Sequence, residues 1–160
     1  MPTFAKSLLA TAAGLALFGG ISASANAQTG GVHEGPLASS CWGTKLETRF
    51  LNDPYSGRRV GRVELWYSPQ DGGTNCAITY NNGAGTAHTE TYLIVDDNRN
   101  RNNPNVFDPA DRLSYDHGSY NSYAGASFRR DTNGKCVRFG GKVSSLQGWG
   151  NFDSRWMHCG

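Results

Sequence analysis

The chain has 160 residues, with 15 Lys and Arg against 13 Asp and Glu and a formal net charge of +2. Such a near balance leaves no basic stripe able to neutralise several phosphates, so the composition argues against a nucleic-acid-binding protein. A length of this order suits one folded domain with a sizeable core.

The first residues have the parts of a secretory signal peptide. Lys6 precedes an apolar run from Leu8 to Ile21, and a small-residue triplet follows at residues 25–27. The run is interrupted by glycines and is shorter than the roughly 20 residues that a membrane-spanning helix needs, which disfavours the alternative of a retained anchor. We expect residues 1–27 to be removed on export and the mature chain to have no membrane span.

All four cysteines lie in the part of the chain that would be exported. Export leads to an oxidising compartment, where disulfides form and persist. Four cysteines allow three pairings, among which we favour nearest neighbours, Cys41 with Cys76 and Cys136 with Cys159. The second bridge would hold the C-terminal segment, which otherwise tends to fray. A zinc site is the alternative, but the cysteines lack a C-x-x-C spacing, so we expect two disulfides and neither a metal nor a cofactor.

The mature chain is expected to begin with a flexible lead-in at residues 28–40, because this stretch is rich in Gly, Ser and Pro. A single domain at residues 41–160 would follow, in which apolar and polar residues alternate as in half-buried strands. Residues 62–68 and 76–80 show this alternation on either side of a turn-rich segment, which predicts a hairpin.

Three further strands are predicted towards the C-terminus. Residues 86–97 alternate in the same way, and both of their faces become apolar near the end, as in a central strand. Residues 119–131 and 135–141 would form two more strands, joined at Thr132–Gly134, where Asn-Gly favours a tight hairpin turn. Many short strands at this spacing predict an all-β domain, a small antiparallel β-sandwich or open barrel stapled by two disulfides.

Three groups of polar residues were weighed for chemistry, and none is assigned a catalytic role. The Asn-rich segment 96–111 begins like an EF-hand calcium loop but lacks the Gly and Glu that complete one, so a solvated loop is favoured. The run Asp116–Ser119 holds triad residue types, but a turn closed by the Asp side chain explains it better. Glu64 and Glu90 could flank a glycosidic bond, although outward-facing strand carboxylates are commoner.

Aromatic residues make up 11% of the chain, and some of them must form the core. Others lie beside polar or glycine neighbours, where amphipathic rings on a sheet face can stack on sugar rings. Ordinary core and hairpin packing is the alternative for these rings. The candidates for glycan stacking are Trp66, Tyr92, Tyr120 and Tyr123.

Four short motifs form a pattern over roughly residues 60–160. They are Asn75-Cys76, Tyr123–Gly125, Gly134–Cys136 followed by Gly140-Gly141, and the final His158-Cys159. In this pattern the chain resembles the secreted actinobacterial family that includes spore-associated protein A. The segment 96–111 is longer than in that pattern, and Phe139 stands where the family has Trp. The resemblance implies export and association with the cell or spore surface, and it brings no established catalytic residues.

These features predict a secreted, non-enzymatic protein of the cell or spore surface, for which a cell-wall glycan is the candidate ligand. The alternatives are a secreted hydrolase that acts on cell-wall polysaccharide and a small secreted inhibitor or toxin. Clustering of the four candidate aromatic residues on one exposed face would favour glycan binding. Convergence of Glu64 and Glu90 in a cleft would favour an enzyme.

Overall fold

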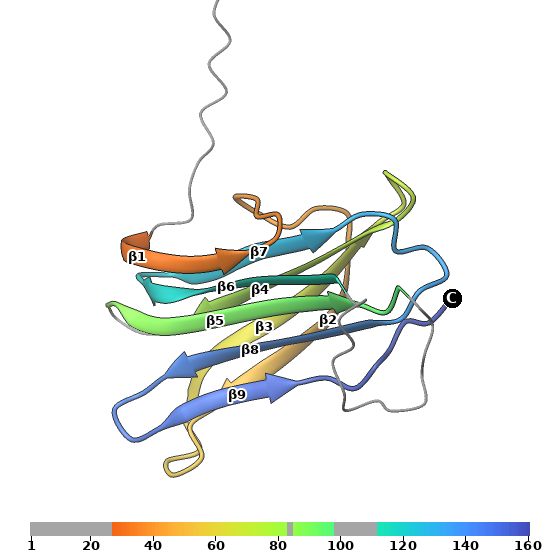
Figure 1. The fold of residues 1–160 in the computed structure, drawn as a ribbon. Coiled ribbons are helices and arrows are strands. Elements are labelled where there is room, and N and C mark those ends of the chain that lie inside the picture. Colours follow the sequence, from red (N-terminus) through yellow and green to blue (C-terminus); the bar gives the residue numbers. More distant parts are fainter. Residues whose placement is uncertain (1–26, 83–84, 98–111) are drawn as a thin grey trace, which may run out of the picture.

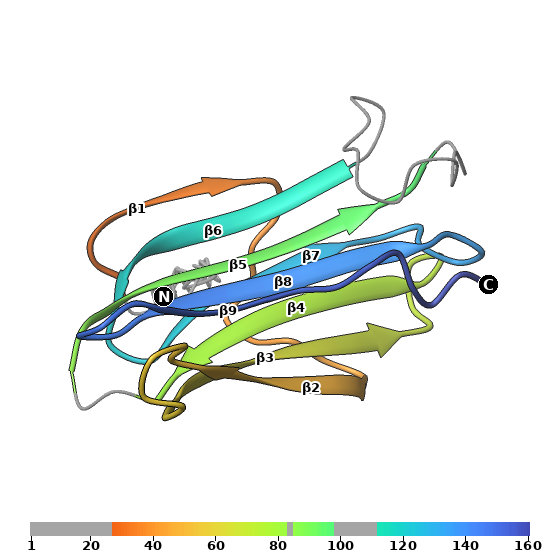
Figure 2. The same cartoon turned by 90° about the horizontal axis from the view of Figure 1, so that it is seen from below.

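The structure is a computed structural model that describes residues 27–82, 85–97 and 112–160. Two antiparallel sheets pack face to face as a β-sandwich (Figure 1 and Figure 2). The five-stranded sheet comprises, in spatial order, β1 (Ala27–Glu34), β6 (Arg112–Tyr120), β5 (Ala87–Val95), β8 (Val137–Ser144) and β9 (Trp149–Asp153). The four-stranded sheet comprises β2 (Thr44–Asn52), β3 (Arg59–Ser68), β4 (Thr74–Asn81) and β7 (Tyr123–Arg129). The predicted all-β sandwich with two disulfides is confirmed.

The core between the sheets follows from the alternation that the sequence predicts in β3 and β5. On β5 one set of side chains, which includes Leu93 and Val95, is fully buried, whereas the alternate set points outward. β5 is the middle strand of its sheet, as its two partly apolar faces predict. The β3–β4 hairpin is also confirmed. The buried apolar core consists of Leu51, Val63, Leu65, Ala77, Leu93, Val95, Val137, Phe139 and Val143.

A strap, residues 36–43, crosses the outer face of the four-stranded sheet. It starts beside β7, where Ala38 and Ala126 exchange backbone hydrogen bonds of 2.9 and 3.0 Å. The Cys41–Cys76 disulfide then ties it to β4. The part of this face formed by β4 and β7 is therefore covered by the protein's own chain, which buries a second apolar cluster. The cluster is formed by Cys76, Ile78 and Ala126, with Ala38, Cys41, Trp42, Trp66, Tyr80, Tyr123 and Phe128 packed around them.

The segment predicted as a flexible lead-in, residues 28–40, forms a strand in its first half. Residues 27–34 form β1, which pairs antiparallel with β6 at the edge of the five-stranded sheet. This segment contains two adjacent glycines, so its sequence lacks the alternation of apolar and polar side chains that predicts a strand. Backbone hydrogen bonds to a neighbouring strand need no side-chain pattern, so the pairing forms nevertheless.

The hairpin predicted at Thr132–Gly134 is wrong. β7 belongs to the four-stranded sheet and β8 to the five-stranded sheet, so the segment between them crosses from one layer to the other. The backbone N–H groups of residues 131–133 donate to the carbonyls of residues 71–73 in the β3–β4 turn, at 3.0 Å each. These bonds hold the crossing segment on a neighbouring loop and leave β7 free to pair with β4.

The C-terminal segment is tied to the body of the domain, as predicted. The Cys136–Cys159 disulfide closes beside an isolated bridge in which Val137 and Met157 exchange two backbone hydrogen bonds of 2.9 Å. Ser154 adds a third bond by donating its N–H to the Phe139 carbonyl. Nearest-neighbour pairing of the cysteines is confirmed. Among the described residues there is no helix that is long and apolar enough to span a membrane.

Candidate functional site

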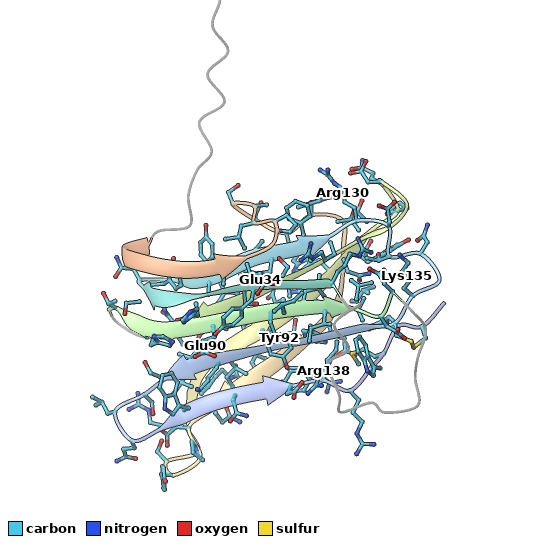
Figure 3. All side chains as sticks on the ribbon, viewed as in Figure 1. Glu34, Glu90, Tyr92, Arg130, Lys135 and Arg138 are labelled. Atoms are coloured by element: carbon cyan, nitrogen blue, oxygen red, sulfur yellow. A yellow bond between two sulfur atoms is a disulfide. The ribbon has the colours of Figure 1, made fainter. Side chains whose placement is uncertain are left out.

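The outward side of the five-stranded sheet, here called the open face, differs from the strap-covered side of the other sheet. Its side chains come from β5, β6, β8 and β9, and strand register arranges them in rows. One row runs from Tyr115 through Tyr92 and Gly140 to Asp153. The next row is His117, Glu90, Lys142 and Asn151. Figure 3 shows Glu90, Tyr92 and Arg138 on this sheet.

The Tyr92 ring lies across β8 because residue 140 is a glycine. A Cβ atom at Gly140 would come within 2.4 Å of both Cζ and Oη of Tyr92, so only a residue without a side chain leaves room for the ring. At the far end the Tyr92 hydroxyl donates a hydrogen bond to Oδ1 of Asp153 on β9. Burial raises the pKa of the Tyr92 hydroxyl, and the bond to Asp153 raises it further, so the hydroxyl stays protonated at neutral pH.

A charged pair closes this end of the row. Arg138 donates through Nε to Oδ1 of Asp153 at 2.8 Å and through Nη2 to Oδ2. Burial raises the pKa of Asp153, but the hydrogen bonds from Arg138 and Tyr92 outweigh it and the net shift is downward. The carboxylate is therefore ionised, and a bidentate guanidinium holds it in place.

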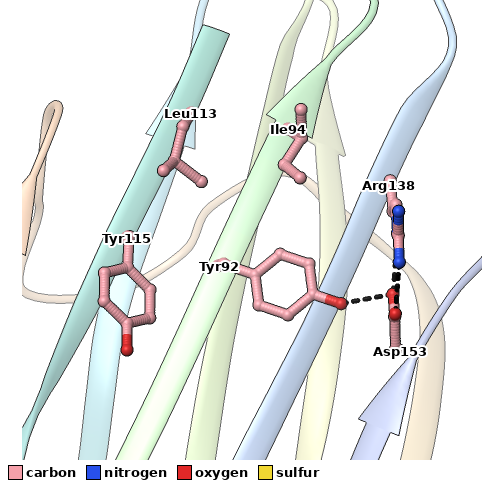
Figure 4. A pocket seen from close by; sticks show the side chains of 6 residues that line it. All are labelled: Tyr92, Ile94, Leu113, Tyr115, Arg138 and Asp153. Carbon is pink, nitrogen blue, oxygen red and sulfur yellow. Dashed lines mark hydrogen bonds and ion pairs between the residues drawn. The ribbon is translucent and has the colours of Figure 1, made fainter. Parts of the chain in front are cut away.

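A shallow hollow of about 420 Å³ lies over this part of the open face (Figure 4). Its two tyrosine rings and two aliphatic side chains make it mainly apolar, and the charged pair supplies polar atoms along one side. Apolar lining with a few placed polar groups is one feature of small-ligand sites, although this hollow is more open than a cleft. The lining residues are Tyr92, Ile94, Leu113, Tyr115, Arg138 and Asp153.

A second group of polar side chains lies beside the hollow on the open face. Nε2 of His88 is 3.1 Å from Oε1 of Glu90, and Nζ of Lys142 is 3.7 Å from the same oxygen. The ring of Tyr115 stacks on His117, with centroids 4.9 Å apart and an interplanar angle of 21°. His88, Glu90 and His117 each bring one ligand atom within 4.8 Å of the other two, so they could hold a metal ion.

The four aromatic residues predicted to stack on sugar do not gather on one face. Only Tyr92 lies on the open face. Trp66 and Tyr123 belong to the cluster on the opposite side of the sandwich, where the Tyr123 hydroxyl donates to the Ser39 carbonyl of the strap. Tyr120 is only 2% exposed, and its hydroxyl donates to a buried carboxylate, so its ring has no face for a ligand.

Sequence reasoning missed Tyr115, Arg138 and Asp153. The sequence does indicate a strand at Tyr115, because Leu113, Tyr115 and His117 alternate with smaller side chains in residues 112–120 and would share one face. Arg138 and Asp153 become neighbours only through the pairing of β8 with β9, which carries no short motif of its own.

Asp116–Ser119 form neither a catalytic triad nor a turn closed by the Asp side chain. These residues lie inside β6. Asp116 points into the sandwich, where it accepts hydrogen bonds of 2.6 Å from the Tyr120 hydroxyl and the Gly125 N–H. His117 points to the open face, so Asp116 and His117 cannot act together as members of a triad.

The two glutamates weighed as a glycosidase pair lie on opposite sides of the sandwich. Glu64 is on the outer face of the four-stranded sheet, where it accepts hydrogen bonds from Arg62 at 2.9 Å and from Trp66 at 3.1 Å. Glu90 is on the open face. Their separation by two sheets prevents them from flanking one glycosidic bond. Of the segment 96–111, all but residues 96 and 97 lies outside the described residues.

Comparison with protein-family models, with curated proteins and with solved structures finds no match for this chain.

Proposed function

We propose that this protein is exported and associated with the cell or spore surface, where it binds a cell-wall glycan on the open face without cleaving it. The observation that carries the proposal is the Tyr92 ring, which lies across Gly140 with the Asp153–Arg138 pair at its hydroxyl end. A second ring, Tyr115, stands beside it in the same row.

The chemistry of this row suits a sugar. A pyranose ring has an apolar C–H face that packs on an aromatic ring, and hydroxyl groups at its rim that need hydrogen-bond partners. Tyr92 and Tyr115 offer the rings, and both line the hollow. Arg138 offers donors and Asp153 offers acceptors at one side of the rings. Fixing these groups before the ligand arrives reduces the entropy lost on binding.

Export is supported by the N-terminal segment, which has the composition of a signal peptide, and by two disulfides that would persist in an oxidising compartment. The resemblance to the family that includes spore-associated protein A adds association with the cell or spore surface to the proposal. The placement of Glu64 and Glu90 on opposite faces removes the carboxylate pair on which the hydrolase alternative depended.

The test is sedimentation of the oxidised mature domain with purified cell wall, combined with zymography on the same polymer. Wild type should be retained without releasing soluble sugar. Tyr92→Ala should lose at least about fivefold in affinity, because stacking on an aromatic ring contributes roughly 1 kcal/mol or more. Phe50→Ala is the matched control, since Phe50 is half exposed on β2 of the other sheet and should bind as wild type does.

Equal retention of wild type and Tyr92→Ala would refute the site, and release of soluble sugar would favour a hydrolase instead.

A further inference from the structure

We propose that His88, Glu90 and His117 form a binding site for a divalent transition-metal ion on the open face, with Zn²⁺ as the ion that fits best. The proposal concerns side chains beside the hollow and does not depend on glycan binding.

The sheet brings the three residues together from two neighbouring strands. Glu90 on β5 is directly opposite His117 on β6, and His88 is two residues before Glu90 on the same face. Strand pairing fixes their backbones, so bringing the ligands to an ion requires only side-chain rotation. All three ligands therefore lie on hydrogen-bonded strands rather than on loops.

The distances are close to those a metal requires. Nε2 of His88 and Oε1 of Glu90 are 3.1 Å apart, and the ligand atoms of all three residues lie within 4.8 Å of one another. Bonds of about 2.0–2.1 Å to a tetrahedral zinc ion place its ligands roughly 3.3 Å apart. The largest of these separations exceeds the zinc spacing by no more than about 1.5 Å, so side-chain adjustment has to close that difference.

The donor set selects the kind of ion. Two imidazoles and one carboxylate suit Zn²⁺ and other transition metals, whereas Ca²⁺ and Mg²⁺ prefer a shell of oxygen atoms. The side chains of His88 and Glu90 are 34% and 22% exposed, so an ion can enter from solvent. Three protein ligands leave a fourth position for water or for a ligand group.

Two neighbouring side chains, Lys142 and Tyr115, affect how tightly the site would bind a metal ion. The Lys142 ammonium, 3.7 Å from Oε1 of Glu90, already places a positive charge beside the carboxylate and would compete with the ion. The same ammonium lies 4.1 Å from the centroid of the Trp149 ring, which would hold it once it leaves Glu90. Tyr115, stacked on His117, limits the orientations of that imidazole and acts as a positioning residue.

The test is isothermal titration of ZnCl₂ into the oxidised mature domain, prepared without a histidine tag. Wild type should bind one ion, and His117→Ala and Glu90→Gln should each weaken binding by at least about tenfold. Lys142→Gln should strengthen binding, because it removes the competing charge. His158→Ala is the control, since His158 lies on the C-terminal segment beside Glu47 and should leave the affinity unchanged.

Titration of the wild-type domain with Co²⁺ gives a readout that does not depend on the stability of any variant. Strong visible absorption from a tetrahedral site is expected, and Zn²⁺ should abolish it. No heat with Zn²⁺ and no Co²⁺ spectrum at millimolar metal would overturn the proposal, as would equal affinity of wild type and His117→Ala. Because no glycan is present, these outcomes are separate from any failure of the cell-wall assay.

Discussion

Removal of the Cys136–Cys159 bridge is expected to lower the free energy of unfolding by about 3 kcal/mol. The bridge closes a segment with a sequence separation of 23, and the loop-entropy relation gives about 3.4 kcal/mol for a loop of that size. Cys136 is fully buried, so the double variant C136A/C159A avoids placing a hydroxyl group in apolar surroundings. A loss of this size is a large share of the 5–15 kcal/mol typical of a domain.

Urea unfolding followed by tryptophan fluorescence measures the effect. For a slope of about 1–3 kcal/mol/M, the midpoint should fall by about 1 to 3 M. Amide exchange at Val137 and Met157 should accelerate as well, because these residues hold the C-terminal segment through two backbone hydrogen bonds. The variant C41A/C76A, which opens a separation of 35, should lose a similar amount. A loss below about 1 kcal/mol in C136A/C159A would refute the reasoning that this bridge acts through the unfolded chain.

Two further predictions concern single side chains. Hydrogen bonds from the Ser145 hydroxyl and the backbone of Ser56 lower the pKa of Asp53 to about 2, below the value near 3.9 of an unfolded chain. The folded state thus binds the proton less readily, so the stabilisation is complete above about pH 4 and is lost as the pH falls towards 2. Urea midpoints between pH 5 and pH 2 should fall less steeply in Asp53→Asn than in wild type, and parallel curves would contradict this. Gly140→Ala should lower stability by about 1–3 kcal/mol and reduce cell-wall retention, because its Cβ would lie 2.4 Å from Tyr92 and 2.5 Å from the Phe152 carbonyl oxygen. Unchanged urea unfolding and retention would mean that the Tyr92 ring does not need the glycine.

The sequence predicts the strands whose side chains alternate. Leu93 and Val95 point inward from β5 and Tyr92 points outward, as the pattern of residues 86–97 requires. Nearest-neighbour disulfides were also predicted correctly. These features depend on local chemistry, namely the two-residue period of a strand and the pairing of thiols in an oxidising environment.

Features that depend on pairing between distant strands could not be predicted in the same way. The Asn133-Gly134 pair has the composition of a hairpin turn, yet bonds to the β3–β4 turn place its flanking strands in different sheets. The candidate sites also depend on pairing between strands that are distant in the sequence. Asp153 reaches Tyr92 across β8, and His117 reaches Glu90 from a strand that follows in the chain only after the segment 98–111. A single sequence contains the residues of such a site but not their register.

The strap held by Cys41–Cys76 has a consequence for how the molecule would act on a polymer. The strap covers the outer face of β4 and β7, so the apolar cluster there is shielded from a polymer. On the proposed function, each molecule would therefore bring one glycan-binding face, the open face, to a polymer. Reduction of that disulfide would uncover apolar surface on the second side, and self-association would be the first result.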